Sequence, residues 1–218
     1  MLWCCLVGLS LLGRGTIAQE SAQVSPLTIG QTITIESVVL DEKRQLNVYL
    51  PASYESQTES SYPVIYLLDG SLDEDFIHIV GLVQFGSFSW IKMVPESIVV
   101  GVANVDRKRD FTSPSNNERD NTELPTSGGS ARFIKALGEE ILPLINRHYR
   151  TNGEETIIGQ SLGGLVATQI LYEHTGLFDN YIIVSPSLWW DDESLLKSEP
   201  PKFDKPTAVL LASARKGR

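Results

Sequence analysis

Five short, uninterrupted apolar segments recur along the chain and restrict its fold to a few architectures. A strand buried on both faces of a parallel sheet has this composition, because none of its side chains faces water. Two helical segments lie among them: 131–149 carries apolar residues three and four apart, and 162–174 is apolar enough to pack on a sheet. Strands that alternate with helices predict an α/β fold with a mostly parallel sheet and helices on both of its faces. The apolar segments are 63–68, 97–103, 155–158, 181–184 and 207–212.

The residues before these segments predict an antiparallel start to the sheet. Residues 31–40 (QTITIESVVL) alternate and are rich in β-branched side chains, and residues 44–50 (RQLNVYL) alternate until Pro51 stops them. Two such runs joined by a short turn indicate a β-hairpin. The chain contains no internal repeat and no second linker, so residues 19–218 are expected to form one domain.

Residues 1–18 (MLWCCLVGLSLLGRGTIA) differ in composition from the rest and resemble a secretory leader. The apolar run from 2 to 12 is too short to span a bilayer, so no stable membrane span is expected. Thr16 and Ala18 are small residues at suitable positions for signal peptidase, with cleavage before Gln19. No Lys or Arg precedes the apolar run, so a wrongly assigned start is the alternative. We predict a signal peptide over 1–18 and a periplasmic or secreted protein.

The charge and the metal-binding residue types exclude several functions. The chain has 18 Lys and Arg against 27 Asp and Glu, a net charge of −9, and nucleic-acid binding needs a basic surface. Both cysteines, Cys4 and Cys5, lie in the predicted leader, so neither a disulfide nor a thiolate metal site is expected in the mature chain. With only three histidines, no ligand cluster is apparent. We therefore expect no metal and no organic cofactor.

The sequence Gly159-Gln160-Ser161-Leu162-Gly163-Gly164 contains the strongest candidate for a catalytic residue. A G-x-S-x-G motif alone is a modest signal, but here an apolar strand precedes it and an apolar helix follows it. A sharp strand-to-helix turn raises the serine hydroxyl above the carboxyl end of the sheet, and small neighbours relieve crowding. The backbone N–H of Leu162, at the helix start, can then donate to a developing oxyanion. Ser161 is predicted to be a nucleophile; the alternative is a structural Gly-Ser turn.

A second oxyanion donor is expected in the loop after the strand at 63–68. The glycine in Asp69-Gly70-Ser71 lets the backbone approach a ligand closely. The backbone N–H of Gly70 or Ser71 is the candidate donor. The alternative is an ordinary turn at the end of a strand.

Five motifs in order along the chain resemble the esterase D-like family of α/β hydrolases. This family includes enterochelin-type siderophore esterases, feruloyl esterases and S-formylglutathione hydrolases, and the likeness extends over about 27–212. The resemblance implies an α/β-hydrolase fold, Ser161 as nucleophile, and carboxylic-ester or thioester substrates of small size. The motifs are PVIYLLDG (63–70), VANVDRKRDFTSP (102–114), SGGSARFIKALGEEILPLINRHYR (127–150), GQSLGG (159–164) and LFDNYIIVSPSLWW (177–190).

Four further residues are candidates for substrate binding. Arg107 and Arg109 follow the strand at 97–103, and planar guanidinium groups can hold an anionic or catecholate-bearing substrate. The alternative is that Asp110 pairs with an arginine and braces the loop. Trp189 and Trp190 follow the strand at 181–184, where aromatic side chains can line an acyl or aryl pocket. Simple packing against the next helix is equally compatible with at least one of them.

The remaining members of a catalytic triad are missing from the sequence pattern. In this fold the order is Ser, then Asp or Glu, then His, and the acid is expected after the strand at 207–212. Residues 213–218 (SARKGR) contain no acid and no histidine. His174 is predicted to end the helix after Ser161, far from its hydroxyl; His148 is predicted to be a partly buried packing residue; and His78 is a poor geometric substitute.

These observations lead to an expectation about the chain as a whole. The last strand and helix of the fold are predicted to be absent, with apolar surface exposed and activity lost, because a serine without a base is a weak nucleophile. The family function predicted for this chain is that of a serine esterase acting on siderophore-like or aryl esters; the alternatives are a non-catalytic ligand-binding protein on the same scaffold and an acyltransferase. The sequence does not determine the oligomeric state.

Overall fold

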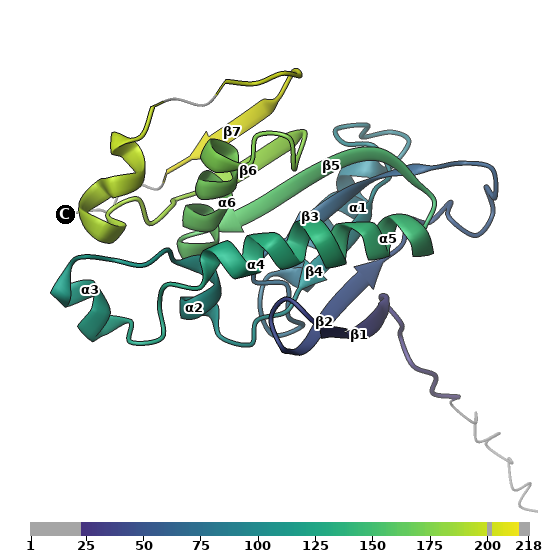
Figure 1. The fold of residues 1–218 in the computed structure, drawn as a ribbon. Helices are drawn as coiled ribbons and strands as arrows, with labels where there is room; N and C mark the ends of the chain where they lie inside the picture. The colour runs from purple at the N-terminus through teal and green to yellow at the C-terminus, as the bar shows by residue number, and fades with distance from the viewer. Residues whose placement is uncertain (1–22, 200–201, 214–218) are drawn as a thin grey trace, which may run out of the picture.

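A computed structural model describes residues 23–199 and 202–213. These residues form a seven-stranded sheet with helices on both faces (Figure 1). The predicted signal peptide at 1–18 lies outside the described residues. No helix in the described part of the chain is long and apolar enough to cross a membrane.

The sheet confirms the predicted mostly parallel architecture. Its strands lie in the order β1-β2-β4-β3-β5-β6-β7. The pairs β1–β2 and β2–β4 are antiparallel, and the pairs β4–β3, β3–β5, β5–β6 and β6–β7 are parallel. The predicted N-terminal hairpin is therefore present as β1 and β2. The strands are β1 Gln31–Ser37, β2 Glu42–Tyr49, β3 Tyr62–Leu67, β4 Ile98–Val102, β5 Thr151–Gln160, β6 Asn180–Val184 and β7 Ala208–Ala212.

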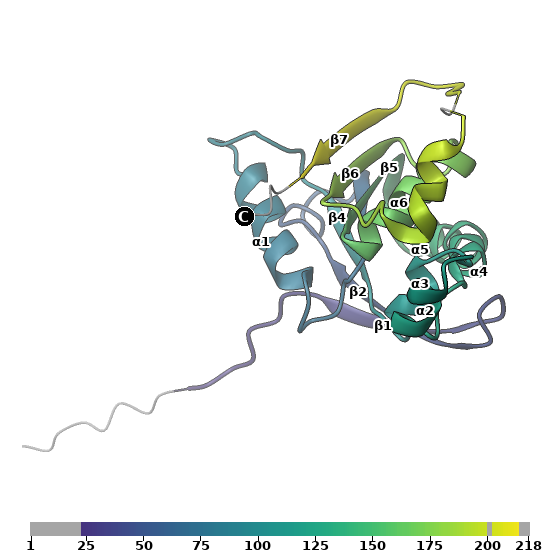
Figure 2. The same cartoon turned by 90° about the vertical axis from the view of Figure 1, so that its left-hand side faces the viewer.

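The helices form two unequal layers. Figure 2 shows α1 by itself on one face of the sheet and the other helices on the opposite face. No sequence pattern indicated α1, although the predicted fold class has helices on both faces of the sheet. The helical elements are α1 Phe76–Ser87, α2 Arg107–Phe111, α3 Glu118–Glu123, α4 Ser130–Ala136, the π-helical turn η1 Leu137–Ile141, α5 Leu142–His148, α6 Leu162–Glu173 and the 3-10 segment η2 Trp190–Lys197.

The single helix predicted over 131–149 is present but changes its hydrogen-bond pattern midway. The α-helical segments α4 and α5 are joined by η1 without a break in the chain. Pro143 lies at the start of α5. A proline donates no backbone hydrogen bond and crowds the carbonyl four residues earlier, so the preceding turn widens to a π-helical form.

The larger cluster of buried apolar residues includes side chains of α4 and α6, and a smaller cluster holds α1 against the sheet. In the smaller cluster, Phe76 and Val80 of α1 pack near Leu67 of β3 and Val99 of β4. All five residues of β4 are buried, as an uninterrupted apolar segment predicts. Central strands thus lie between two layers of side chains, and loops at their carboxyl ends are held on a rigid base.

The same expectation of burial is wrong for β7. All five of its residues are exposed, and Leu210 and Leu211 expose 60% and 61% of their surface. Among the described residues β7 lies at the edge of the sheet and pairs only with β6. Composition alone indicated a buried strand, but burial depends on which elements cover it.

Candidate active site

Ser161 occupies the turn between β5 and α6, as the motif predicts. Its backbone has φ 55° and ψ −115°, a left-handed conformation that is strained for any residue with a side chain. Three backbone hydrogen bonds hold it there: the Ser161 N–H donates to the carbonyl of Val184 (3.0 Å), and the Ser161 carbonyl accepts from the N–H groups of Leu165 (2.9 Å) and Ser187. The turn therefore fixes a half-buried hydroxyl at the carboxyl edge of the sheet.

The side chain that hydrogen-bonds the Ser161 hydroxyl belongs to Ser187, which no sequence pattern indicated as a site residue. Ser187 Oγ lies 3.2 Å from Ser161 Oγ, and the Ser187 N–H donates to the Ser161 carbonyl (3.0 Å). Ser187 is buried and follows β6, the strand beside β5. Residues that follow neighbouring parallel strands meet at one edge of a sheet, which was the available signal.

A shallow depression of about 280 Å³ opens beside Ser161. It is formed where the loops after β3, β4 and β5 meet, the usual position of ligand sites in open α/β sheets. Three carboxylates face one guanidinium in it, so its charge is mainly negative. The lining residues are Asp69, Glu74, Asp75, Arg107, Gln160 and Ser161.

The predicted oxyanion loop lies beside this depression and is held close to the sheet. Gly70 packs directly on the backbone of β4, where an added methyl group would lie 2.3 Å from the Cα of Gly101. The Gly70 N–H donates to the carbonyl of Val102 (3.1 Å), and the Gly70 carbonyl accepts from Asn47 Nδ2 (2.8 Å). The Gly70 N–H is thus already engaged in the structure and is a poor candidate for an oxyanion donor.

Two other backbone donors are better placed to serve an oxyanion. Ser71 donates its N–H to the carboxylate of Glu74 at 3.2 Å, a long and exposed hydrogen bond that a ligand can replace. Leu162 is the first residue of α6, so its N–H has no partner within the helix. Of the predicted donors, Leu162 and Ser71 remain compatible with the geometry.

The two predicted substrate-binding arginines separate in the structure. Arg107 lines the depression, and its Nε and Nη2 atoms bind the two carboxylate oxygens of Asp69 at 2.6 and 2.9 Å. These hydrogen bonds raise the pKa of Arg107. Its side chain is 34% exposed, which leaves the guanidinium edge accessible to a ligand.

Arg109 points away from the depression into a network of charged side chains. Its guanidinium binds Asp110 (2.8 Å) and, with two further hydrogen bonds of 3.0 and 2.7 Å, Glu42 of β2. The hydrogen bond to Asp110 and that to Glu42 raise the pKa of Arg109. Asp110 also binds Arg44, and both of these side chains are buried. The alternative interpretation, in which an arginine braces the loop through Asp110, fits Arg109.

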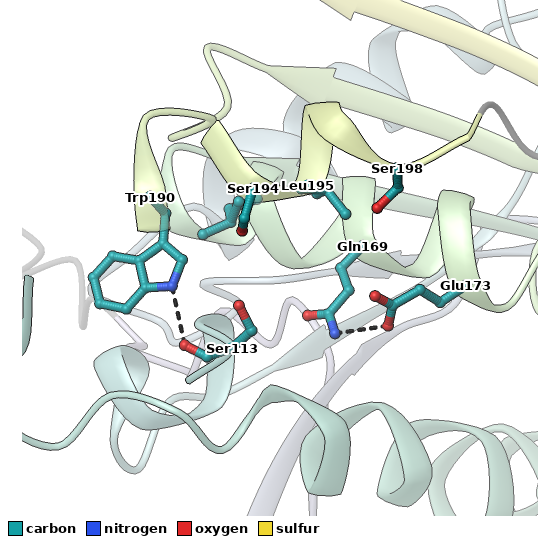
Figure 3. A pocket seen from close by; sticks show the side chains of 8 residues that line it. Ser113, Gln169, Glu173, Trp190, Ser194, Leu195 and Ser198 are labelled. Carbon is teal, nitrogen blue, oxygen red and sulfur yellow. Dashed lines mark hydrogen bonds between the residues drawn. The ribbon is translucent and has the colours of Figure 1, made fainter. Parts of the chain in front are cut away.

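Neither tryptophan lines the depression at Ser161. Trp190 is 2% exposed and donates its indole N–H to the carbonyl of Ser113 (3.0 Å), while Trp189 is 54% exposed and packs edge-on against it. Figure 3 shows Trp190 at one end of a separate cavity of about 200 Å³, between η2 and α6. Trp190 therefore packs in the core, as predicted by the alternative interpretation in which at least one of the two tryptophans is a packing residue.

None of the three histidines lines the depression at Ser161. His78 lies on the exposed side of α1, and His174 follows the last turn of α6. The prediction of a partly buried His148 is wrong, because it is exposed and its Nδ1 contacts only the carbonyl of Leu144 (2.9 Å). The described residues also contain no cluster of three or more His, Cys, Asp or Glu side chains that could hold a metal ion.

Comparison with known proteins assigns the chain to a family of esterases. The profile of the putative esterase family matches residues 37–218, and the chain belongs to that family. This confirms the resemblance to esterases that the five motifs indicated. The α/β-hydrolase architecture is confirmed by solved structures of the same fold.

The curated relatives include siderophore esterases. Ferri-bacillibactin esterase BesA of Bacillus subtilis (strain 168) is 29% identical over 192 residues, which cover 79% of this chain and 66% of that protein. Iron(III) salmochelin esterase of Escherichia coli O6:H1 is 26% identical over 171 residues, or 75% of this chain and 37% of that protein. The chain thus spans about two thirds of one relative and little more than one third of the other.

Two solved structures align over most of the chain. An IroE-like serine hydrolase from Shewanella oneidensis is 35% identical with a TM-score of 0.71, covering 77% of this chain and 54% of that one. The BES protein from Bacillus cereus is 28% identical with a TM-score of 0.73, covering 88% of this chain and 76% of that one. The shared fold thus extends over 77% of this chain in one comparison and 88% in the other.

Proposed function

We propose that this protein is a serine esterase that hydrolyses carboxylic esters through an acyl-enzyme on Ser161. The observation that carries this proposal is the strained backbone of Ser161 at the strand-to-helix turn, beside a depression open to solvent. A left-handed serine costs stability, and such strain persists where it serves to present a reactive group. Membership of the putative esterase family supports the same reaction class.

The proposed reaction proceeds in two steps. Ser161 Oγ attacks the ester carbonyl carbon while its proton passes to a general base, and the carbonyl oxygen becomes an oxyanion held by the N–H groups of Leu162 and Ser71. The C–O bond to the alcohol then breaks, and the alcohol leaves with the proton. Water next attacks the acyl group, releases the carboxylic acid and returns a proton to Ser161.

The general base is the part of this mechanism that the residues around the depression do not supply. None of the three histidines lines it, and Asp69 and Glu74 are hydrogen-bonded to Arg107, Asn104 and the Ser71 N–H rather than to Ser161. The Ser187 hydroxyl at 3.2 Å is too weak a base at neutral pH to activate Ser161. We therefore expect these 218 residues by themselves to react slowly. Imidazole added to the solution is expected to accelerate the reaction by replacing the base.

The proposed substrates are siderophore-like or aryl esters of small molecules. Two curated relatives are named as siderophore esterases, which supports this class. Arg107 lines the depression with a side chain that is 34% exposed, and it is proposed to contact an anionic or catecholate group of the substrate. We also propose that the protein is exported, because residues 1–18 resemble a secretory leader. An intact mass that places the amino terminus at Gln19 tests this proposal.

Covalent labelling tests the nucleophile and the base separately. A fluorophosphonate is expected to modify Ser161, with loss of fluoride, and Ser161→Ala abolishes the modification. The exposed Ser56→Ala variant is the matched control and is expected to label normally. Modification at another serine, or none with imidazole present, contradicts the proposed nucleophile. Fast labelling that imidazole does not change contradicts the proposed lack of a base.

A ligand-binding protein on the same scaffold is the second candidate, because no histidine lines the depression. Saturable binding of an aryl ester without turnover, unaffected by Ser161→Ala, favours that function. Acyl transfer uses the same serine and differs only in the acceptor. Formation of a glycerol ester in place of the free acid, detected by mass spectrometry, identifies it.

A further inference from the structure

Arg107 connects two of the three loops that form the depression. Its guanidinium binds both carboxylate oxygens of Asp69, at 2.6 and 2.9 Å, in the loop after β3. The same Nη2 atom donates to the carbonyl of Gln160 at 3.3 Å, in the turn that presents Ser161. The oxyanion loop and the nucleophile turn are thus linked through one side chain from a third loop.

The Asp69 carboxylate lies directly against the first turn of α6. A methyl group added to Gly163 would lie 3.3 Å from Asp69 Oδ2. Asn104 Nδ2 also donates to Asp69 Oδ1 at 2.7 Å, and the Asp69 backbone is left-handed with φ 56°. A residue held in this conformation by so many contacts has one well-defined position. Asp69 is therefore a fixed anchor for Arg107.

The charge of Asp69 would oppose ester hydrolysis if it were left unpaired. The carboxylate is 10% exposed and lies against Gly163, the residue that follows the proposed oxyanion donor Leu162. A second negative charge at such a distance raises the energy of an oxyanion, and the interaction is strong where water is partly excluded. Two hydrogen bonds from Arg107 compensate the charge in place.

We propose that Arg107 and Asp69 form a clasp that fixes the distance between the nucleophile turn and the oxyanion loop and neutralises Asp69 beside the developing oxyanion. Arg107 is in this respect a positioning residue, in addition to any contact that it makes with substrate. The proposal rests on the proposed function of Ser161 for its effect on rate. Its geometric part stands without that function.

A double-mutant cycle on the 218-residue chain tests the effect on rate. Labelling by a neutral fluorophosphonate, with imidazole present, is measured for Arg107→Met, Asp69→Asn and the double variant. The first-order labelling constant of Arg107→Met is expected to fall by about tenfold or more, because the Asp69 charge is uncompensated. The double variant is expected to regain a large part of that loss, and Arg107→Lys to lie between Arg107→Met and the wild type.

The matched control is Arg119→Met, which breaks an arginine–carboxylate pair of similar length on α3. Arg119 Nε lies 2.7 Å from Glu123, and the Arg119 side chain is 80% exposed. This variant is expected to label at the wild-type rate. A double variant as slow as Arg107→Met, with weaker reagent binding in both, overturns the clasp and assigns Arg107 to direct substrate binding.

Hydrogen exchange tests the geometry without requiring activity. Arg107→Met is expected to raise exchange in two peptides together, one covering 68–76 and one covering 158–165, whereas Arg119→Met changes neither. Increased exchange in only one of them, or in neither, overturns the clasp. If the wild type is not labelled at Ser161, the proposed function fails while the exchange result still decides whether the clasp exists.

Discussion

Gly159, two residues before Ser161, is expected to tolerate no side chain. A methyl group there would lie 2.3 Å from the carbonyl oxygen of Gly163 and 2.6 Å from its carbonyl carbon. Both atoms belong to the backbone, so no side-chain rotation relieves the contact. The start of α6 must move away from β5 by about 1 Å to restore normal packing. We expect Gly159→Ala to lower the free energy of unfolding by about 3 kcal/mol, the upper part of the range for overpacking.

Two other glycines give matched comparisons. A methyl group at Gly163 would meet its neighbours at 3.3 Å or more, so Gly163→Ala is expected to cost less than about 1 kcal/mol. Gly81, exposed in the middle of α1, has nothing within 4 Å of the added methyl group. Gly81→Ala is expected to stabilise the chain by about 0.5–1 kcal/mol, because alanine favours a helix over glycine.

Urea unfolding followed by far-ultraviolet circular dichroism measures all three variants. The expected order of midpoints, from lowest to highest, is Gly159→Ala, Gly163→Ala, wild type and Gly81→Ala. A midpoint for Gly159→Ala equal to that of the wild type refutes the close approach of α6 to β5. A larger loss at Gly163 than at Gly159 does the same.

Three further predictions concern stability and self-association. Asp110→Asn removes a charged partner of the buried Arg44 and is expected to cost about 3 kcal/mol in urea unfolding; a cost below about 1 kcal/mol contradicts it. Burial raises the pKa of Tyr181 to about 12, whereas the pKa of this side chain in the unfolded chain is about 10. As the pH rises from about 10 to 12, the unfolded chain loses a proton that the folded chain keeps, so the free energy of unfolding falls. Tyr181→Phe should therefore move alkaline unfolding to higher pH, and an unchanged midpoint is evidence against this linkage. Leu210→Lys with Leu211→Lys is expected to reduce self-association in sedimentation velocity, since these side chains lie exposed on an edge strand.

The elements that the sequence predicted well are those whose signal is local. Uninterrupted apolar segments identified the strands from β3 to β7, and alternation identified β1 and β2. The glycines around Ser161 identified the strand-to-helix turn, because they mark a backbone conformation that few sequences adopt. Pro143 was visible in the sequence, but its effect on the hydrogen-bond pattern of 131–149 was not anticipated.

The parts of the candidate site that were missed depend on distant residues. Ser187 lies against Ser161 only because β6 pairs with β5, and Asp69 meets Arg107 only because the loops after β3 and β4 converge. Arg107 and Arg109 are two residues apart and looked equivalent in the sequence. Their side chains nevertheless enter a depression and a charged network, respectively.

The sequence by itself determined the α/β class, the order of the strands along the chain and the position of the nucleophile turn, since each follows from the properties of neighbouring residues. Only the tertiary structure decided which charges are paired, which tryptophan is buried and which apolar strand remains exposed. Burial and ion pairing are relations between elements, and the sheet brings together residues as far apart as Asp69 and Gln160. The chemistry around Ser161 therefore depends on how the loops meet at the edge of the sheet.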